Sequence, residues 1–227
     1  MVTAIVLAAG RSTRMGGGAN KQFISLLGKP LLWYSLAAFE RCAAVDAVVL
    51  VRSPEHAAPL EKIVRESGFK KVAGYADGGT ERQNSVWNGL DRCDSQTEIV
   101  AVHDGARPLV TPELIEATVQ SAREHGTGIA ATKVVDTIKE ADETRTILRT
   151  VDRTRLWAVQ TPQTIRFGLL REAYALVLKK NLVVTDEAAA VELLGHPVRL
   201  VETRFLNLKI TTPADLGVVE ALLQQRQ

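Results

Sequence analysis

Short apolar runs alternate with helical patterns along most of this chain. The first run, residues 2–8, is continuously apolar, as in a strand that is buried on both faces of a sheet. Residues 30–39 follow with apolar side chains at helical spacing, and Pro30 suits a first helical turn. This alternation predicts βαβ units and an α/β fold: a Rossmann-like, mostly parallel (mixed) sheet with helices on both faces.

The alternation continues to the C-terminus. Further strands are predicted at residues 47–52, 70–74, 99–103, 128–134, 198–202 and 206–210. Further helices are predicted at about 54–67, 81–92, 112–125, 166–180 and 213–224, with another beginning at 185–187 and capped by Thr185. The alternative to this cap is a catalytic role for Asp186 and Glu187. Residues 161–163 are predicted to be a turn that ends a strand. The 227 residues suffice for one α/β domain, and we expect a single domain over residues 1–227.

The loops that follow the parallel strands should meet at one edge of this sheet. Right-handed crossovers place the carboxyl ends of such strands together, and open α/β sheets bind ligands there. Three segments are brought to this edge: Gly10 to Lys21, Gly78 to Ser85, and His103 to Arg107. We therefore expect a functional site at this edge.

The loop from Gly10 to Lys21 contains four glycines, two arginines, one lysine and no acidic residue. Backbone N–H groups and fixed cations of this kind bind polyphosphates. The loop has neither the Gly-Lys-Ser/Thr of a Walker A motif nor a GxGxxG pattern, so Arg14 and Lys21 are expected to reach phosphate with their side chains. The alternative is an ordinary glycine-rich loop that only meets solvent.

Asp104 ends the apolar strand at residues 98–103, at the same edge of the sheet. A carboxylate facing phosphates is unfavourable unless a cation lies between them, so Asp104 suggests Mg²⁺ held directly or through water. The alternative is a structural aspartate that accepts backbone N–H groups of the next turn. His103 is interpreted as a packing residue, because one histidine without partners makes no metal site.

The glycine pair Gly78-Gly79 precedes Thr80, which is predicted to cap the helix that carries Arg82 and Ser85. A tight turn with an ordinary cap explains this pattern as well as a ligand-binding turn does. The spacing alone leaves both interpretations open.

Ten motifs follow one another over nearly the whole chain. They are Ala8-Ala9-Gly10, Arg14-Met15-Gly16, Lys21-Gln22, residues 78–86, 103–108, 136–139, 151–153, 161–163, 185–187 and 207–211. Together they resemble the cytidylyltransferases that act on 2-C-methyl-D-erythritol 4-phosphate, within the nucleotidyltransferases that join sugar or polyol phosphates to nucleotides. Ser12 and Asn20 stand where many members carry glycine and proline. The resemblance implies transfer of CMP from CTP to 2-C-methyl-D-erythritol 4-phosphate, release of pyrophosphate, and Mg²⁺ as cofactor.

The resemblance also implies a role for individual residues. Arg14 and Lys21 would stabilise charge on the α-phosphoryl group, Ala8, Ala9, Gly10, Gly79, Ser85 and Asp104 would bind the nucleotide, and Arg107, Thr137, Arg153 and Lys209 would hold the polyol phosphate. D-ribitol 5-phosphate cytidylyltransferase is the nearest alternative, although that relative commonly has glycine in place of Ala9. An idle nucleotide-binding protein is a second alternative, but it would have no reason to keep Arg14, Lys21, Arg153 and Lys209 together.

A hairpin is predicted at about residues 134–153, where two alternating strands flank a polar turn. It has too few apolar residues to bury itself, and an isolated two-stranded hairpin is marginal in water. A partner should therefore cover it. The resemblance implies a homodimer with exchanged arms, in which Thr137 and Arg153 of one chain help to complete the site of the other.

The composition restricts partners and compartment. A formal net charge of +2 gives no electrostatic reason to expect a nucleic acid polymer. Cys42 and Cys93 lie in no CxxC or metal spacing and are interpreted as reduced packing residues. No apolar run approaches the ~18 residues of a membrane span, and the apolar start lacks the basic region of a signal peptide. We expect a cytoplasmic protein without a membrane partner.

Overall fold

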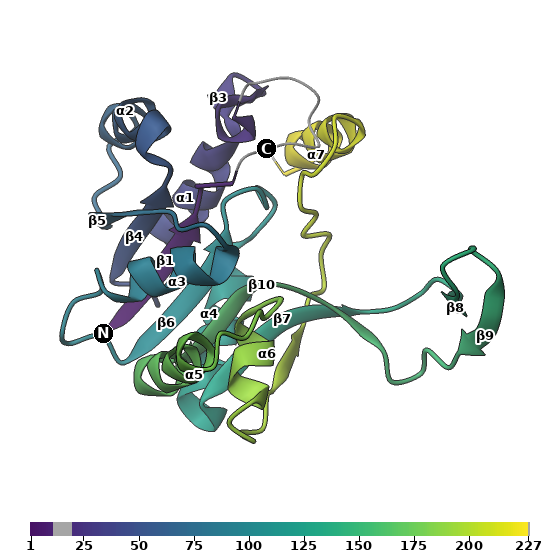
Figure 1. The fold of residues 1–227 in the computed structure, drawn as a ribbon. Helices are drawn as coiled ribbons and strands as arrows, with labels where there is room; N and C mark the ends of the chain where they lie inside the picture. The colour runs from purple at the N-terminus through teal and green to yellow at the C-terminus, as the bar shows by residue number, and fades with distance from the viewer. Residues whose placement is uncertain (11–19, 227) are drawn as a thin grey trace.

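The computed structural model describes residues 1–10 and 20–226, and in this part seven strands form one sheet in the order β11-β7-β10-β6-β1-β4-β5 (Figure 1). β1 (Val2–Leu7) pairs in parallel with β4 (Ala47–Arg52) and with β6 (Ile99–Asp104). β4 pairs in parallel with β5 (Val72–Asp77). The predicted α/β class and mostly parallel sheet are confirmed.

One strand runs against the others. β10 (Trp157–Arg166) lies antiparallel between β6 and β7 (Thr127–Lys133), and β11 (Leu200–Glu202) pairs in parallel with β7. The predicted turn at residues 161–163 is therefore wrong, since these residues lie inside β10. Proline cannot donate to a strand ladder, and the register between β10 and β7 shifts between Val159 and Gln163 around Pro162.

The helices cover both faces of the sheet. α1 (Leu31–Arg41), α2 (Ala57–Ser67) and α4 (Pro112–His125) pack on one face, and α3 (Arg82–Leu90), α5 (Phe167–Lys179) and α6 (Glu187–Glu192) pack on the other. In β1, Ala4 and Val6 belong to the first apolar cluster and Ile5 to the second, and all three are fully buried. Because successive side chains of a strand point to opposite faces, only a continuous apolar run fits this position.

A third apolar cluster closes the carboxyl edge of the sheet. α7 (Ala214–Gln224) contributes Val219 and Leu223, which pack with Leu109 and Ile210. Nearby lie the short elements η2 (Lys21–Phe23), β2 (Ser25–Leu26) and β3 (Lys29–Pro30), while η3 (Pro54–His56) precedes α2. Residues 206–210 form no strand, contrary to the prediction. Their apolar pattern reflects packing of Ile210 in this cluster instead of pairing with the sheet.

Two helices begin one residue later than predicted. Asp186 caps α6 by accepting from the Ala189 N–H at 2.9 Å, so Thr185 is not the cap. Glu81 is the N-cap of α3, where Asn84 completes a capping box, so Thr80 is not the cap. In both cases the last extended residue before the helix carries an acidic side chain that takes the place of the threonine hydroxyl.

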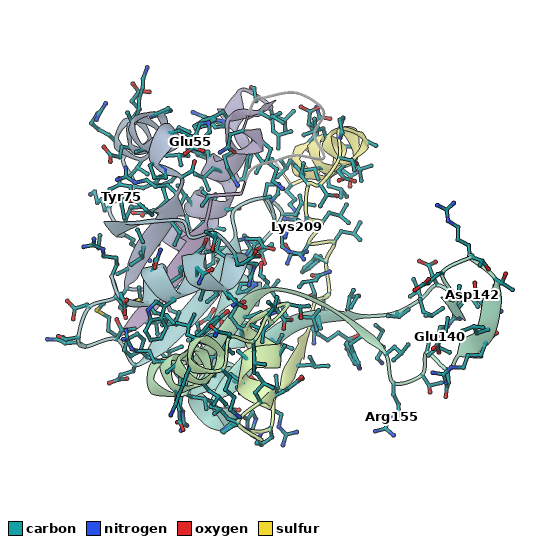
Figure 2. All side chains as sticks on the ribbon, in the orientation of Figure 1. Glu55, Tyr75, Glu140, Asp142, Arg155 and Lys209 are labelled. Atoms are coloured by element: carbon teal, nitrogen blue, oxygen red, sulfur yellow. The ribbon has the colours of Figure 1, made fainter. Side chains whose placement is uncertain are left out.

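The predicted hairpin is present as β8 (Ile138–Ala141) and β9 (Ile147–Val151), which pair with each other outside the main sheet. It projects from the ends of β7 and β10 (Figure 1), and Glu140, Asp142 and Arg155 lie on this projection, apart from Lys209 (Figure 2). No helix of the described residues is long and apolar enough to cross a membrane.

Candidate active site

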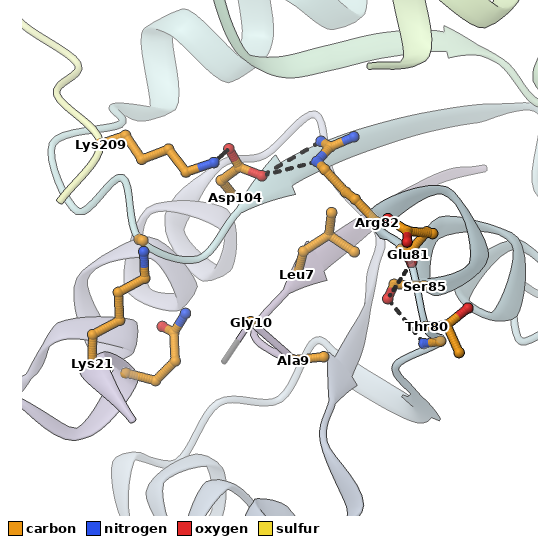
Figure 3. A pocket seen from close by; sticks show the side chains of 13 residues that line it. Leu7, Ala9, Gly10, Lys21, Thr80, Glu81, Arg82, Ser85, Asp104 and Lys209 are labelled. Atoms are coloured by element: carbon orange, nitrogen blue, oxygen red, sulfur yellow. Dashed lines mark hydrogen bonds and ion pairs between the residues drawn. The ribbon is translucent and has the colours of Figure 1, made fainter. Parts of the chain in front are cut away.

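A pocket of about 310 Å³ opens at the carboxyl edge of the sheet (Figure 3). Its walls come from the ends of β1, β5 and β6, the first turn of α3, η2 and the segment before α7. The lining residues are Leu7, Ala9, Gly10, Lys21, Gln22, Gly79, Thr80, Glu81, Arg82, Ser85, Asp104, Ala106 and Lys209. The predicted convergence of three loops at this edge is confirmed, and the volume lies in the range of small-molecule sites.

The structure brings many of the predicted site residues together. Ala9, Gly10, Lys21, Gly79, Ser85, Asp104 and Lys209 all line the pocket. Ala8 does not, because it is fully buried and its N–H donates to the Val51 carbonyl at 2.7 Å. Arg14, with Ser12, lies outside the described residues.

Three predicted residues that hold the polyol phosphate lie off the pocket wall. Arg107 donates through Nη1 to the Asn207 carbonyl at 2.7 Å, with its Nε 3.8 Å from the Asp104 carboxylate. Thr137 and Arg153 are exposed on the hairpin side, where Arg153 donates to the Val135 carbonyl. Neither one reaches the pocket of its own chain.

The glycine pair sits where side chains would collide. A Cβ on Gly78 would lie 2.4 Å from the Ala9 Cβ, and one on Gly79 would lie 2.2 Å from the Asn84 Cβ. Such distances are far inside van der Waals contact. Glycine at position 78 therefore lets the turn approach the first loop, and glycine at position 79 lets it pack against the first turn of α3. Of these residues, Ala9 and Gly79 border the pocket.

Ser85 fixes this turn. Its Oγ accepts from the Gly79 N–H at 3.0 Å and donates to the Glu81 carbonyl at 3.2 Å. The hydroxyl therefore ties the glycine pair to the first turn of α3, and the side chain still borders the pocket.

Lys21 links the first loop to the C-terminal segment. Asn20 caps η2 by accepting from the Gln22 N–H at 3.0 Å, which sets the direction of the lysine. The Lys21 Nζ then donates to the Ile210 carbonyl at 2.9 Å, beside Lys209. Two lysines from opposite ends of the chain thus border one pocket.

Asp104 is the acidic centre of the site. Lys209 Nζ donates to its Oδ2 at 2.7 Å, and Arg82 binds its Oδ1 at 3.4 Å through both Nε and Nη2. Burial alone would raise the pKa of this carboxyl, but the charges of Arg82 and Lys209 outweigh it and hold the pKa well below its usual range. Asp104 is therefore ionised at neutral pH.

His103 is fully buried and does not face the pocket. Its Nδ1 lies 3.1 Å from the Thr161 Oγ1, and its Nε2 lies 3.4 Å from the Arg107 carbonyl. The Thr161 Oγ1 in turn accepts from the Asp104 N–H at 3.0 Å. Burial lowers the pKa of His103 to about 3, so the ring is neutral at physiological pH and holds the Asp104 backbone in place.

Two charged residues at the site were not assigned a role from the sequence. Arg82 lines the pocket from the first turn of α3, and Glu187, fully buried in α6, binds its guanidinium. Glu187 belongs to a motif that was interpreted as a helix start. Its interaction with a residue about a hundred positions away has no local signal in the sequence.

The chain matches known proteins over nearly its whole length. The family model described as 2-C-methyl-D-erythritol 4-phosphate cytidylyltransferase matches residues 2–225. The chain belongs to this family. Among curated relatives that carry the same name, the protein of Pelotomaculum thermopropionicum is 45% identical over 227 residues, which cover 100% of this chain and 95% of the relative. That of Alkaliphilus metalliredigens is 43% identical, over 100% of this chain and 94% of the relative.

Solved structures of the cytidylyltransferase family share the fold. The 4-diphosphocytidyl-2C-methyl-D-erythritol synthase of Anaerococcus prevotii superposes with a TM-score of 0.87 at 30% identity, covering 98% of this chain and 96% of its own. The 2-C-methyl-D-erythritol 4-phosphate cytidylyltransferase of Thermus thermophilus gives 0.81 at 33% identity, with coverage of 99% and 100%. These likenesses do not favour the ribitol 5-phosphate alternative.

Proposed function

We propose that this chain transfers CMP from CTP to 2-C-methyl-D-erythritol 4-phosphate and releases pyrophosphate, a step in making isoprenoid precursors. The observation that carries the proposal is the pocket in which the first loop, the glycine pair and the cations Lys21 and Lys209 meet, in a chain that matches the family over residues 2–225. The pocket is rich in fixed cations, as the binding of two phosphorylated substrates requires.

The attacking group needs no general base. A phosphate monoester has a second pKa of about 6 and is mostly dianionic at neutral pH. One of its oxygens attacks the α-phosphorus of CTP, the bond from that phosphorus to the bridging oxygen of the β-phosphate breaks, and pyrophosphate leaves with the electron pair. The protein's contribution is to align the two anions and to stabilise charge on the α-phosphoryl group.

The described residues divide this work along the pocket. Gly79, Ser85 and Ala9 border the pocket and would contact the cytosine base, where close backbone approach selects a pyrimidine over a larger purine. Lys21 would meet the α-phosphoryl group, together with Arg14, and Lys209 would hold the phosphate of the acceptor. An ammonium group has three N–H donors, so Lys21 would meet a phosphate oxygen without having to give up its bond with the Ile210 carbonyl.

Magnesium fits the site when the nucleotide is present. Within the described part of the chain, no group of three or more His, Cys, Asp or Glu side chains could hold a metal ion. Asp104 is ionised, borders the pocket and can supply one oxygen, and Mg²⁺ commonly combines one or two carboxylates with substrate phosphates and water. When bound, the ion would neutralise charge on the triphosphate.

The dimer with exchanged arms is part of the proposal. Val135, Ile147 and Leu148 are 77%, 59% and 61% exposed on and beside the hairpin, so their apolar side chains lack cover within one chain. Thr137 and Arg153 are exposed there too. A second copy of the chain packed on the hairpin would bury these apolar side chains. Thr137 and Arg153 would then reach the active site of that second copy. The free thiols of Cys42 and Cys93 are consistent with work in the reducing cytoplasm.

Substrate specificity is tested directly. Purified protein is incubated with CTP and Mg²⁺, with either 2-C-methyl-D-erythritol 4-phosphate or D-ribitol 5-phosphate as acceptor, and pyrophosphate is measured. Release with the first acceptor alone supports the proposal. Release with ribitol 5-phosphate alone would assign the other activity, and no release with either would indicate an idle nucleotide-binding protein.

Subunit mixing tests the shared site. Arg153→Ala and Lys21→Ala proteins, each nearly inactive, are dissociated and reassembled together. About half of the dimers would be mixed, each with one intact site, giving roughly a quarter of wild-type activity if the sites are independent. A mixture no more active than its parents, with subunit exchange verified, would place Arg153 outside the partner's site.

A further inference from the structure

Glu187 is a charged side chain in the interior, with 0% exposure. Its Oε1 accepts from Arg82 Nη1 at 2.5 Å and from the Tyr174 hydroxyl at 3.0 Å, and its Oε2 accepts from Arg82 Nη2 at 3.1 Å. A buried carboxylate is costly unless it is paired and hydrogen-bonded, and here both conditions are met. An apolar residue would fill the same space at lower cost, so the pair calls for a role beyond packing.

Arg82 connects this buried carboxylate to the pocket. The edge of the guanidinium formed by Nε and Nη2 lies against Asp104, where both nitrogens are 3.4 Å from a single oxygen, Oδ1 (Figure 3), and Nη2 is shared with Glu187. The other oxygen, Oδ2, accepts from Lys209 Nζ at 2.7 Å. Four groups of alternating charge, from Glu187 through Arg82 and Asp104 to Lys209, therefore run from the interior to the pocket wall.

The contact between Arg82 and Asp104 is long and one-sided. Arginine prefers a bidentate pair with both oxygens of a carboxylate, at about 2.7–2.9 Å. The side chain makes its bidentate pair with Glu187 instead, with its two shorter bonds on that side. Glu187 thus keeps the guanidinium from closing on Asp104, and Oδ2 stays available to Lys209.

We propose that Glu187 is a positioning residue: it holds Arg82 so that one oxygen of Asp104 remains for Lys209 and the lysine keeps its place in the pocket. The inference rests on the proposed function, in which Lys209 holds the phosphate of the acceptor. Without the negative charge of Glu187, Arg82 would form the bidentate pair with Asp104 and displace Lys209. The acceptor phosphate would then lose its fixed partner.

The Glu187→Gln substitution tests this, because it keeps the size of the side chain and removes the charge. We expect kcat/KM for 2-C-methyl-D-erythritol 4-phosphate to fall about 10- to 100-fold, as is typical when a residue that supports a site ligand is lost. Asp186→Ala is the matched control: it removes the cap of the same helix but touches neither Arg82 nor Asp104. It should lower the melting temperature and leave kcat/KM within about threefold of wild type.

The decisive readout is coupling to Lys209, which helix stability alone would not produce. In a Lys209→Ala background, Glu187→Gln should lower kcat/KM for the acceptor by less than about threefold, because the group that Glu187 positions is already absent. An equal cost in both backgrounds would overturn the inference. Where Glu187→Gln does not fold, Arg82→Lys replaces it, since lysine cannot bind both carboxylates as a fork, and the same coupling is expected.

A crystal structure of the Glu187→Gln protein gives a second readout that does not depend on activity. It should show Arg82 bound to both oxygens of Asp104 and Lys209 moved away. An unchanged arrangement would contradict the inference even if activity fell. A wild-type protein without transferase activity would refute the proposed function alone, whereas an active wild type with an uncoupled Glu187 would refute only this inference.

Discussion

The free energy of unfolding should decrease steeply as the pH is lowered through a range set by His103. Burial lowers the pKa of this ring to about 3 in the folded chain, against about 6.5 in an unfolded one. Between these values the unfolded state binds the proton and the folded state does not, so the contribution is fully present above about pH 6.5 and is lost as the pH falls toward 3. The slope approaches about 1.4 kcal/mol per pH unit but is only half as steep at pH 6.5, which amounts to about 2.3 kcal/mol between pH 6.5 and 4.5.

Urea unfolding at pH 7.0, 6.0, 5.0 and 4.5 measures this slope. Carboxylates also lose stability in acid, so His103→Gln serves as the reference: glutamine keeps an amide near the Thr161 hydroxyl but has no proton to gain. The variant should be less stable than wild type at pH 7, and the difference should shrink by about 2.5 kcal/mol on going to pH 4.5. In an NMR titration, the His103 ring should show no protonation between pH 5 and 8.

Two results would refute this reasoning. A difference between wild type and His103→Gln that stays constant with pH would show that the ring does not titrate between the folded and unfolded states. A ring resonance that titrates near pH 6.5 would show that His103 is open to solvent. Either result would also contradict the conclusion that His103 and Thr161 hold the Asp104 backbone in place.

Three further predictions follow from the pocket. Gly79→Ala should weaken CTP binding roughly 5- to 100-fold in calorimetry, because the new Cβ would lie 2.2 Å from that of Asn84, whereas Gly74→Ala, with open space at its Cβ, should not. Lys21→Ala should lower kcat by about 10²-fold or more with a smaller effect on CTP affinity, and near-normal kcat with raised KM would contradict its role. Asp104→Ala should cost about 3–5 kcal/mol of unfolding free energy at pH 7, since it leaves several cations facing one another; a loss below about 1 kcal/mol would show that they relax apart.

The sheet and the position of the pocket were predictable because they depend on repeated local patterns. A strand buried on both faces must be continuously apolar, and β1 is. Parallel strands joined through helices bring their carboxyl ends together, so the meeting of Gly10, Gly79 and Asp104 required only the order of elements. The roles assigned to these residues stay predictions.

β10 and residues 206–210 were mispredicted for the opposite reason. Pro162 interrupts the strand pattern locally, but the ladders with β6 and β7, which are far away in sequence, carry β10 past it. Residues 206–210 alternate like a strand, yet β11 already occupies the edge of the sheet beside β7. Long-range pairing decided both cases, and a local pattern does not contain it.

Glu187 shows how the same limit applies to a functional site. An acidic residue in the first turn of a helix is explained by the helix dipole, so the sequence favoured a helix start over a catalytic role for Glu187. Only the packing of α6 against α5 and α3 places this carboxylate at 0% exposure beside Arg82 and Tyr174. A charge that could remain in solvent at little cost has been buried and paired at greater cost, and that difference, visible only in three dimensions, marks Glu187 as part of the site.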